Sequence, residues 1–171
     1  ERVAESLQRV INHVRTKTVD NPGPDPSVDI PFVSRVPNEF KPPVVPGNMA
    51  FAAFDAAYAM APYLIGDDEA LIVRGRWPEC VFGNICLWNR WGQMYDYVNR
   101  QVSRNRANTT LDADGGFTMV LAHSDPGHPN WIDTEGRNLG TMFFRFFLPE
   151  GEMVTPTCEV VKFADLPSKL G

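Results

Sequence analysis

Two apolar segments, ALIVRGRW at residues 70–77 and CVFGNICLWN at residues 80–89, decide the fold of this chain. Three further segments are similarly rich in β-branched and aromatic residues: FTMVLAH at 117–123, TMFFRFFLP at 141–149 and TCEVVKF at 157–163. Proline, glycine and aspartate residues typical of turns separate the five segments. Strands joined by short turns and by one long polar loop predict a mainly antiparallel β-sandwich of the jelly-roll type.

The N-terminal residues 1–17 have a different pattern, in which apolar side chains recur at helical spacing. Glutamate, arginine and glutamine occupy the opposite face. This pattern predicts an amphipathic surface helix whose apolar face needs a partner: the domain itself, another subunit or a further N-terminal region. The apolar residues are Val3, Leu7, Val10, Ile11 and Val14.

A proline-rich segment follows, since eight of the fifteen prolines lie within residues 18–47. Proline fixes φ and removes a backbone donor, so the segment is expected to be extended. A flexible linker rarely contains so many large apolar residues. We therefore expect an arm that buries them on a surface of this chain or of a neighbouring subunit. They are Ile30, Phe32, Val33, Phe40, Val44 and Val45.

An alanine-rich stretch, NMAFAAFDAAYAMA at residues 48–61, comes between the arm and the strands. Asn48 can cap a helix and Pro62 can end one, so a short buried helix is predicted here. The expected domain organisation is a helix plus arm over residues 1–47 and a β-sandwich domain over residues 48–171.

Composition excludes several classes of function. The formal net charge is −5 and the pI about 5.2, which argues against nucleic-acid binding because phosphates require clustered cations. No apolar run approaches the roughly 20 residues that span a bilayer. The three cysteines lack metal-type spacing and are expected to be free thiols, which favours a reducing compartment such as the cytoplasm. The first residue is Glu1 and not Met, which indicates a processed or truncated product.

Several ordered motifs between Tyr63 and Glu152 resemble the uncharacterised domain-of-unknown-function family numbered 1214. They are ALIVRGRWPECVFGNICLWN, YDYVNR, LDADGGFTMVLAHSDPG, PNWIDTEGR and FFRFFLPEGE. The resemblance implies a β-sandwich of jelly-roll character, which in longer members follows a second β domain. This chain differs, because a helix and an arm precede the motifs. The chemistry of the family is not established, so the resemblance assigns no catalytic residue.

The residues His123, Asp125 and His128 form an H-x-D-x-x-H pattern at a strand end. Histidine and aspartate bind divalent metals, so a metal ion is one candidate cofactor. The alternative is structural: an aspartate before Pro-Gly commonly bonds to the backbone of its own turn.

The carboxylates Asp133 and Glu135 follow Trp131, and an aromatic ring beside acids suits a sugar. Asp96 or Asp125 could supply a second catalytic carboxylate, with His123 as an acid, base or ligand. The alternative is that Trp131 closes one end of the sandwich while the carboxylates cap a turn.

Further candidate ligand-binding residues are Tyr95, Arg100 and Asn130. Arginine binds carboxylates through its planar fork, so Arg100 could capture an anionic ligand. Alternatively, Arg100 pairs with Asp96 or Asp133 and fixes the loop that contains it over the strand predicted at residues 117–123.

Two functions follow from these observations. The first is a non-catalytic binding or assembly module whose helix and arm pack on a partner domain or a sister subunit. The alternative is an enzyme acting on a glycan or another polar small molecule. Motifs for hydride transfer and for nucleotide-dependent phosphoryl transfer are missing from the sequence.

Overall fold

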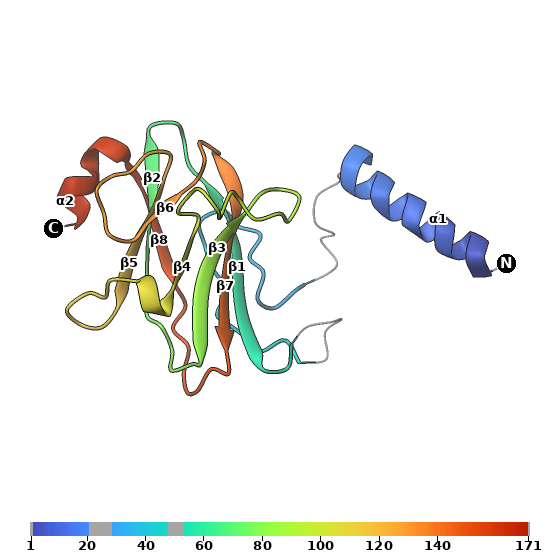
Figure 1. Cartoon of the computed structure of the whole chain (residues 1–171), viewed down its shortest axis with the longest axis horizontal. Coiled ribbons are helices and arrows are strands. Elements are labelled where there is room, and N and C mark those ends of the chain that lie inside the picture. The colour runs from blue at the N-terminus through green and yellow to red at the C-terminus, as the bar shows by residue number, and fades with distance from the viewer. Residues whose placement is uncertain (1, 21–28, 48–52, 171) are drawn as a thin grey trace. The chain divides into compact units, whose positions relative to one another are not determined.

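The computed structural model describes residues 2–20, 29–47 and 53–170 of the chain (Figure 1). The chain divides into two compact units, Glu1–Ile30 and Pro31–Gly171. The later half of the proline-rich arm thus belongs to the same unit as the strands.

The first unit contains the predicted amphipathic helix, α1 (Arg2–Arg15), followed by a π-helical turn, η1 (Thr16–Asp20). None of the residues of α1 is buried. Its apolar stripe is more than half exposed throughout, from 73% at Val3 to 53% at Val14.

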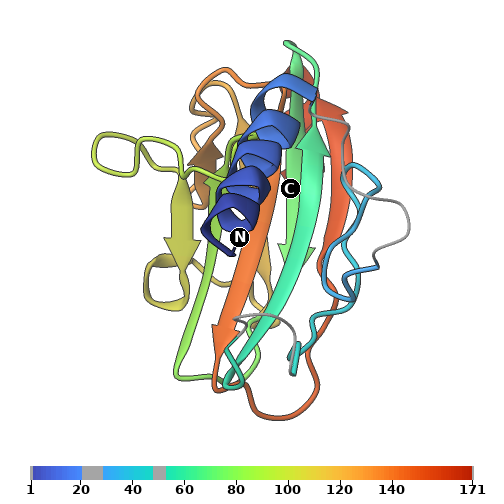
Figure 2. The same cartoon turned by 90° about the vertical axis from the view of Figure 1, so that its right-hand side faces the viewer.

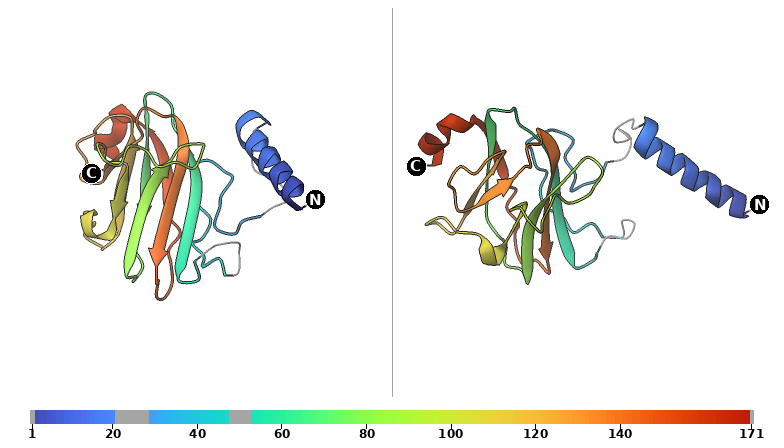
Figure 3. Two further views of the ribbon diagram at one scale, coloured as in Figure 1. Left: turned by 45° about the vertical axis from the view of Figure 1, so that its right-hand side comes forward. Right: turned by 45° about the horizontal axis from the view of Figure 1, so that its top comes forward.

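The second unit is a β-sandwich of two four-stranded sheets (Figures 1 and 3). Sheet A has the strand order β1-β7-β3-β4 and sheet B the order β6-β5-β2-β8. Neighbouring strands are antiparallel except β5 and β6, which are parallel. The elements are β1 (Ala56–Leu64), β2 (Glu69–Gly75), β3 (Phe82–Trp88), β4 (Ser103–Asn105), η2 (Arg106–Asn108), β5 (Phe117–Ala122), β6 (Trp131–Asp133), β7 (Leu139–Phe147), β8 (Thr157–Lys162), η3 (Phe163–Asp165) and α2 (Leu166–Leu170).

The predicted mainly β-sandwich is confirmed, and each of the five apolar segments contains a strand. They form β2, β3, β5, β7 and β8. The three-residue strands β4 and β6 were not predicted, because they are too short to show an alternating pattern.

The main core lies between the two sheets and follows from strand alternation. Side chains of Leu71 and Val73 on sheet B meet Phe144 and Phe146 on sheet A, and all four are buried. Aromatic rings dominate the contact: the Trp77 and Phe117 ring centroids are 5.0 Å apart. Successive side chains point to opposite faces, so the intervening residues form the outer face of each sheet.

The predicted alanine-rich helix is wrong over residues 56–61, which form most of β1. Residues 48–52, including the proposed cap Asn48, lie outside the described residues. Alanine favours helices, but here tertiary pairing overrides that preference. Small residues on β1 face large ones on β7, with Ala59 opposite Phe144 and Ala61 opposite Met142.

The arm lies along the free edge of β1 in the same chain. Ser34 N donates to Met60 O (2.8 Å), and Val44 and Tyr58 exchange both backbone hydrogen bonds. Phe40 enters the core, whereas Val45 stays 43% exposed. Covering an edge strand in this way removes a template for unwanted strand pairing.

The outer face of sheet B carries a second, smaller apolar cluster beneath η3 and α2. Its buried members are Ala70, Ile72, Val120, Ala122, Val161 and Leu166. Within residues 2–20, 29–47 and 53–170, no helix is long and apolar enough to cross a membrane.

Candidate functional site

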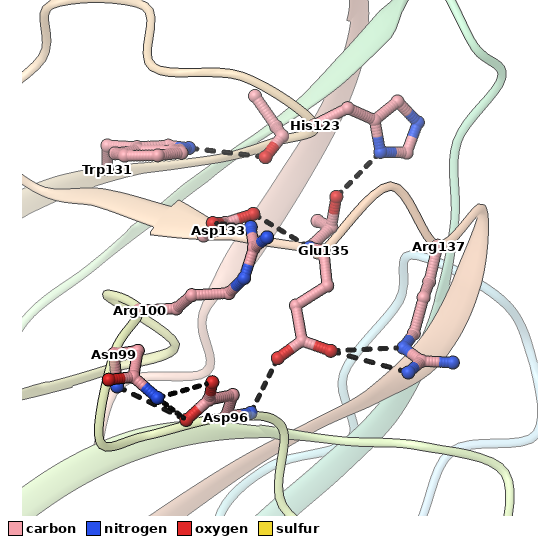
Figure 4. A network of polar contacts seen from close by, with 10 residues as sticks. Asp96, Asn99, Arg100, His123, Trp131, Asp133, Glu135 and Arg137 are labelled. Carbon is pink, nitrogen blue, oxygen red and sulfur yellow. Dashed lines mark hydrogen bonds and ion pairs between the residues drawn. The ribbon is translucent and has the colours of Figure 1, made fainter.

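Five of the ten predicted site residues meet in one group of polar side chains (Figure 4). We call it the polar loop cluster: Asp96, Asn99, Arg100, His123, Asp133, Thr134, Glu135 and Arg137. Its members come from the loop before β4, the end of β5 and the turn after β6. The sequence therefore identified residues that do come together, and their contacts decide what they can do.

The pairing of Arg100 with Asp133 is the strongest contact in the cluster. Arg100 Nη1 lies 2.8 Å from Asp133 Oδ2, and the aspartate side chain is only 6% exposed. The other carboxylate oxygen accepts a hydrogen bond from Glu135 N (2.7 Å). The nearby carboxylate raises the pKa of Arg100. Of the two partners considered for Arg100, the structure selects Asp133, which fixes the loop over β6.

Glu135 occupies the left-handed backbone region with φ of 55°. For a non-glycine residue this costs on the order of 1 kcal/mol. Its carboxylate accepts hydrogen bonds from Asp96 N (2.5 Å) and Arg137 Nη2 (3.3 Å). These bonds hold the turn, so the acid is already engaged by the protein.

Asp96 caps its own loop. One carboxylate oxygen accepts from the backbone of Val98 and Asn99, and the Asn99 amide donates to both oxygens. The hydrogen bonds from Asn99 hold the pKa of Asp96 below its usual value. This arrangement is an Asx turn, and the lowered pKa does not suit Asp96 to general acid catalysis.

Tyr95 is buried and inserts its hydroxyl into the core. The Tyr95 and Tyr63 hydroxyl oxygens lie 2.7 Å apart, and the Arg137 guanidinium sits 5.1 Å from the centre of the Tyr95 ring. Burial raises the pKa of both phenols. Tyr95 thus anchors the loop, and at 3% exposure it offers little surface to a ligand.

His123 bridges two segments with both ring nitrogens. Nδ1 lies 2.6 Å from Thr134 Oγ1, and Nε2 lies 3.2 Å from Gly66 O. A carbonyl oxygen can only accept, so Nε2 donates to Gly66 O, and the ring joins the loop before β2 to the turn after β6.

The predicted metal pattern does not converge. Asp125 Oδ1 accepts from Gly127 N (2.8 Å), as the turn alternative predicted. His128 Nδ1 accepts from Asn130 N, and burial lowers the pKa of this histidine. Among the described residues, no three His, Cys, Asp or Glu side chains are grouped closely enough to hold a metal ion.

Asn130 and Trp131 are also held by the chain itself. Asn130 is 1% exposed, donates to Thr110 O and Thr118 O, and accepts from Thr110 N. Trp131 Nε1 donates to Ala122 O, and the ring packs against the outer cluster of sheet B. Asn130 thus offers almost no surface to a ligand, and part of the Trp131 ring is occupied by the outer cluster.

An open hollow of about 590 Å³ lies beside the cluster. His123 is the one predicted site residue that lines it. The other lining residues are Asp67, Asp68, Glu69, Ser124, Lys162, Phe163, Ala164 and Asp165. Lys162 is paired with Asp68 (3.0 Å) and Glu69 (3.2 Å). The predicted carboxylates therefore do not face this hollow.

The polar loop cluster thus forms an internally satisfied network. Its carboxylates are hydrogen-bonded to arginines and backbone amides, an arrangement that orders the loops. The three cysteines are free thiols, and burial raises the pKa of Cys158 to about 12. A thiol with such a pKa is a poor nucleophile at neutral pH.

Sequence analysis missed a second feature, the outer face of sheet A. Tyr58, Phe143 and Trp88 lie side by side across β1, β7 and β3, with centroids 5.5 Å and 4.5 Å apart. The alternation within each strand was visible in the sequence. Which of the two faces would be open depends on what packs outside the sheet, and alternation carries no information about that.

The fold and the cluster define a β-sandwich whose polar loops are fixed by internal hydrogen bonds, and comparisons with known proteins agree with this fold. The chain is similar in structure to an uncharacterised protein from Burkholderia cenocepacia, with a TM-score of 0.68 and 30% identity. The match covers 78% of this chain and 36% of the other.

A protein from Vibrio parahaemolyticus is similar in fold, with a TM-score of 0.53 and 20% identity. That match covers 68% of this chain and 33% of the other, so the chain spans about a third of the length of both neighbours. No family model and no curated protein matched the sequence.

Proposed function

We propose that the chain is a binding and assembly module that joins a sister subunit through its N-terminal helix. The observation that carries the proposal is α1, whose five apolar residues are 53–73% exposed. Burying one such side chain contributes about 1.5–3 kcal/mol. An isolated helix of fewer than about 12–15 residues is marginal in water, so a helix of this length gains its stability from a surface.

The spacing of the stripe supports a packing role. Val3, Leu7, Val10 and Val14 are separated by four, three and four residues, which is the alternation of a helix that packs along one seam. Ile11 widens the seam on one side.

The polar loop cluster supports a non-catalytic module. Catalytic acids are commonly recognised by a shifted pKa in an open cleft. Here Asp133 and Glu135 are only 6% and 13% exposed and are bonded to Arg100 and Arg137. In both similar proteins, the region that matches this chain is about a third of a longer chain.

The test is the association state of the whole chain, measured by sedimentation velocity from about 1 µM to about 100 µM, a range that covers moderate affinities. We expect concentration-dependent association that Leu7→Glu/Ile11→Glu abolishes. The matched control, Gln8→Glu/Asn12→Glu, adds the same charge on the polar face and should leave association unchanged. A wild-type chain that stays monomeric over this range would contradict the proposal.

The enzyme hypothesis stays a prediction, as does membership of the family numbered 1214. An enzyme acting on a glycan would require the cluster to open and expose Asp133 or Glu135. Saturable stabilisation by an oligosaccharide in a thermal-shift assay, lost in Asp133→Asn, would favour that alternative.

A further inference from the structure

We infer that the surface receiving α1 is the outer face of sheet A in a second copy of the chain, so that two copies exchange helices. This inference rests on the proposed function and names its partner surface. The receiving surface, which we call the aromatic face, consists of the outward side chains of three strands: Tyr58, Phe82, Trp88, Phe143 and Phe147. Figure 2 looks onto this sheet, with β4, β3, β7 and β1 side by side.

The aromatic face contains a row of adjoining rings and is partly accessible, with Phe143 in its middle only 7% exposed. A row of ring contacts runs from Phe32 in the arm through Tyr58 and Phe143 to Trp88, with centroid distances of 5.4, 5.5 and 4.5 Å. Phe82 remains 45% exposed. A contiguous apolar patch of this kind marks an interaction surface more often than an isolated exposed residue does.

A hollow of about 220 Å³ interrupts the aromatic face. Its lining residues are Asn84, Cys86, Trp88, Gly92, Met94, Phe143 and Arg145, of which Met94 is 42% exposed. The volume lies below the roughly 300–1,000 Å³ of typical small-molecule sites and suits protruding aliphatic side chains better. A helix presenting residues such as Leu7 and Ile11 supplies such protrusions, as amphipathic helices do in apolar grooves.

The net charges of the two units are opposite, whereas the charged side chain that lines the hollow itself is Arg145. Helix α1 carries Arg2, Arg9 and Arg15 against the single acid Glu5, so it is net positive. Residues 31–171 contain sixteen acidic and twelve basic side chains, so the sandwich unit is net negative. Complementary net charge favours the encounter of a helix with the sandwich of another copy.

The area that a helix can bury argues for a reciprocal dimer. Five apolar side chains at about 80 Å² each, matched by the receiving sheet, bury roughly 800 Å² per helix. That value alone is typical of crystal contacts. Two exchanged helices bury roughly 1,600 Å², which is the standard size of a stable interface. The exchange is also closed and two-fold symmetric, as most homodimers are.

The experiment mixes two variants of the full chain, each deficient in one surface. The helix variant is Leu7→Glu/Ile11→Glu, and the face variant is Trp88→Lys/Met94→Lys. Each alone should be monomeric, with the dissociation constant raised at least about 100-fold. Mixed in equal amounts, they should associate more strongly than either variant alone, because one helix–face contact stays intact and the glutamates of the other helix meet the lysines of the other face.

The control for the face variant is Leu111→Lys/Val154→Lys, which places the same charges on exposed apolar residues elsewhere and should leave the wild-type dimer intact. Circular dichroism confirms that each variant is folded. If Trp88→Lys/Met94→Lys does not fold, Met94→Lys alone replaces it, since this exposed side chain lies in a loop.

The outcomes separate this inference from the proposed function. Association that the helix variant abolishes but the face variant does not would indicate pairing of helices, which overturns the inference and leaves the assembly module standing. A mixture that associates no more strongly than either variant alone would likewise overturn the exchange. A wild-type monomer at all concentrations would overturn both.

Discussion

The outer faces of the two sheets differ in what becomes of their apolar side chains. On sheet B, Ile72 and Val120 are fully buried, and Leu166 of α2 packs against the same cluster. On sheet A, Phe82 is 45% exposed and Trp88 is half-buried. Both faces come from the same strand alternation. Within the described residues 31–47 and 53–170, α2 covers the outer face of sheet B, whereas the aromatic residues on the outer face of sheet A are only partly covered.

The largest expected effect comes from placing a charge on each face. Val120→Glu buries an unpaired carboxylate, which should cost about 4 kcal/mol or more or prevent folding. Phe82→Glu makes the same change on the aromatic face and should cost about 1 kcal/mol, since the new carboxylate reaches water. Urea denaturation followed by fluorescence measures both. Equal costs would mean that the outer faces of the two sheets are buried equally deeply, which would contradict the difference described above.

A second prediction concerns the end of sheet A where Tyr95 inserts. A Cβ at residue 140 would overlap the Tyr95 hydroxyl and lie 2.8 Å from Trp88 O. Gly140→Ala should therefore destabilise the protein by about 3 kcal/mol. Gly66→Ala is the control, because the nearest atom is the flexible end of Glu69 at 3.2 Å. A shift of the thermal midpoint no larger than that of the control would show that the loop is not held as described.

The smallest expected effect tests whether the polar loop cluster is structural. Asp133→Asn removes the charge pair with Arg100 and weakens the bond to Glu135 N. Because Arg100 is half exposed, solvent screening limits the cost to about 1–2 kcal/mol. Asp125→Asn keeps its turn and should cost less than about 0.5 kcal/mol. Hydrogen exchange should show faster opening of residues 95–102 in the first variant and not in the second.

Sequence analysis recovered much of the cluster because its members are concentrated in one stretch of the chain. Arg100 and Asp133 were named as a candidate pair, but Asp96 was an equal alternative. Only folding decides between them: β4 and β6 belong to different sheets, and their approach depends on how the sandwich closes. The engagement of Glu135 by the Asp96 amide is a contact across 39 residues that no local pattern encodes.

The alanine-rich segment shows where prediction from local sequence preference fails. Its small residues were assigned to a helix from local preference, yet Ala57, Ala59 and Ala61 are small because Phe144, Phe146 and Met142 stand beside them on β7. Each of these alanines is explained by a partner on β7 more than 80 positions away in the sequence, and intrinsic propensity is too weak to resist such packing.

The sequence by itself determined the amphipathic helix, the five main strands and the free cysteines, because periodicity and residue type act over a few neighbouring positions. The tertiary structure alone decided that β1 is a strand, that the arm follows its edge, which carboxylate Arg100 binds and which sheet face stays accessible. These features depend on contacts between segments distant in the chain, and their free energy is gained only when the sheets pair.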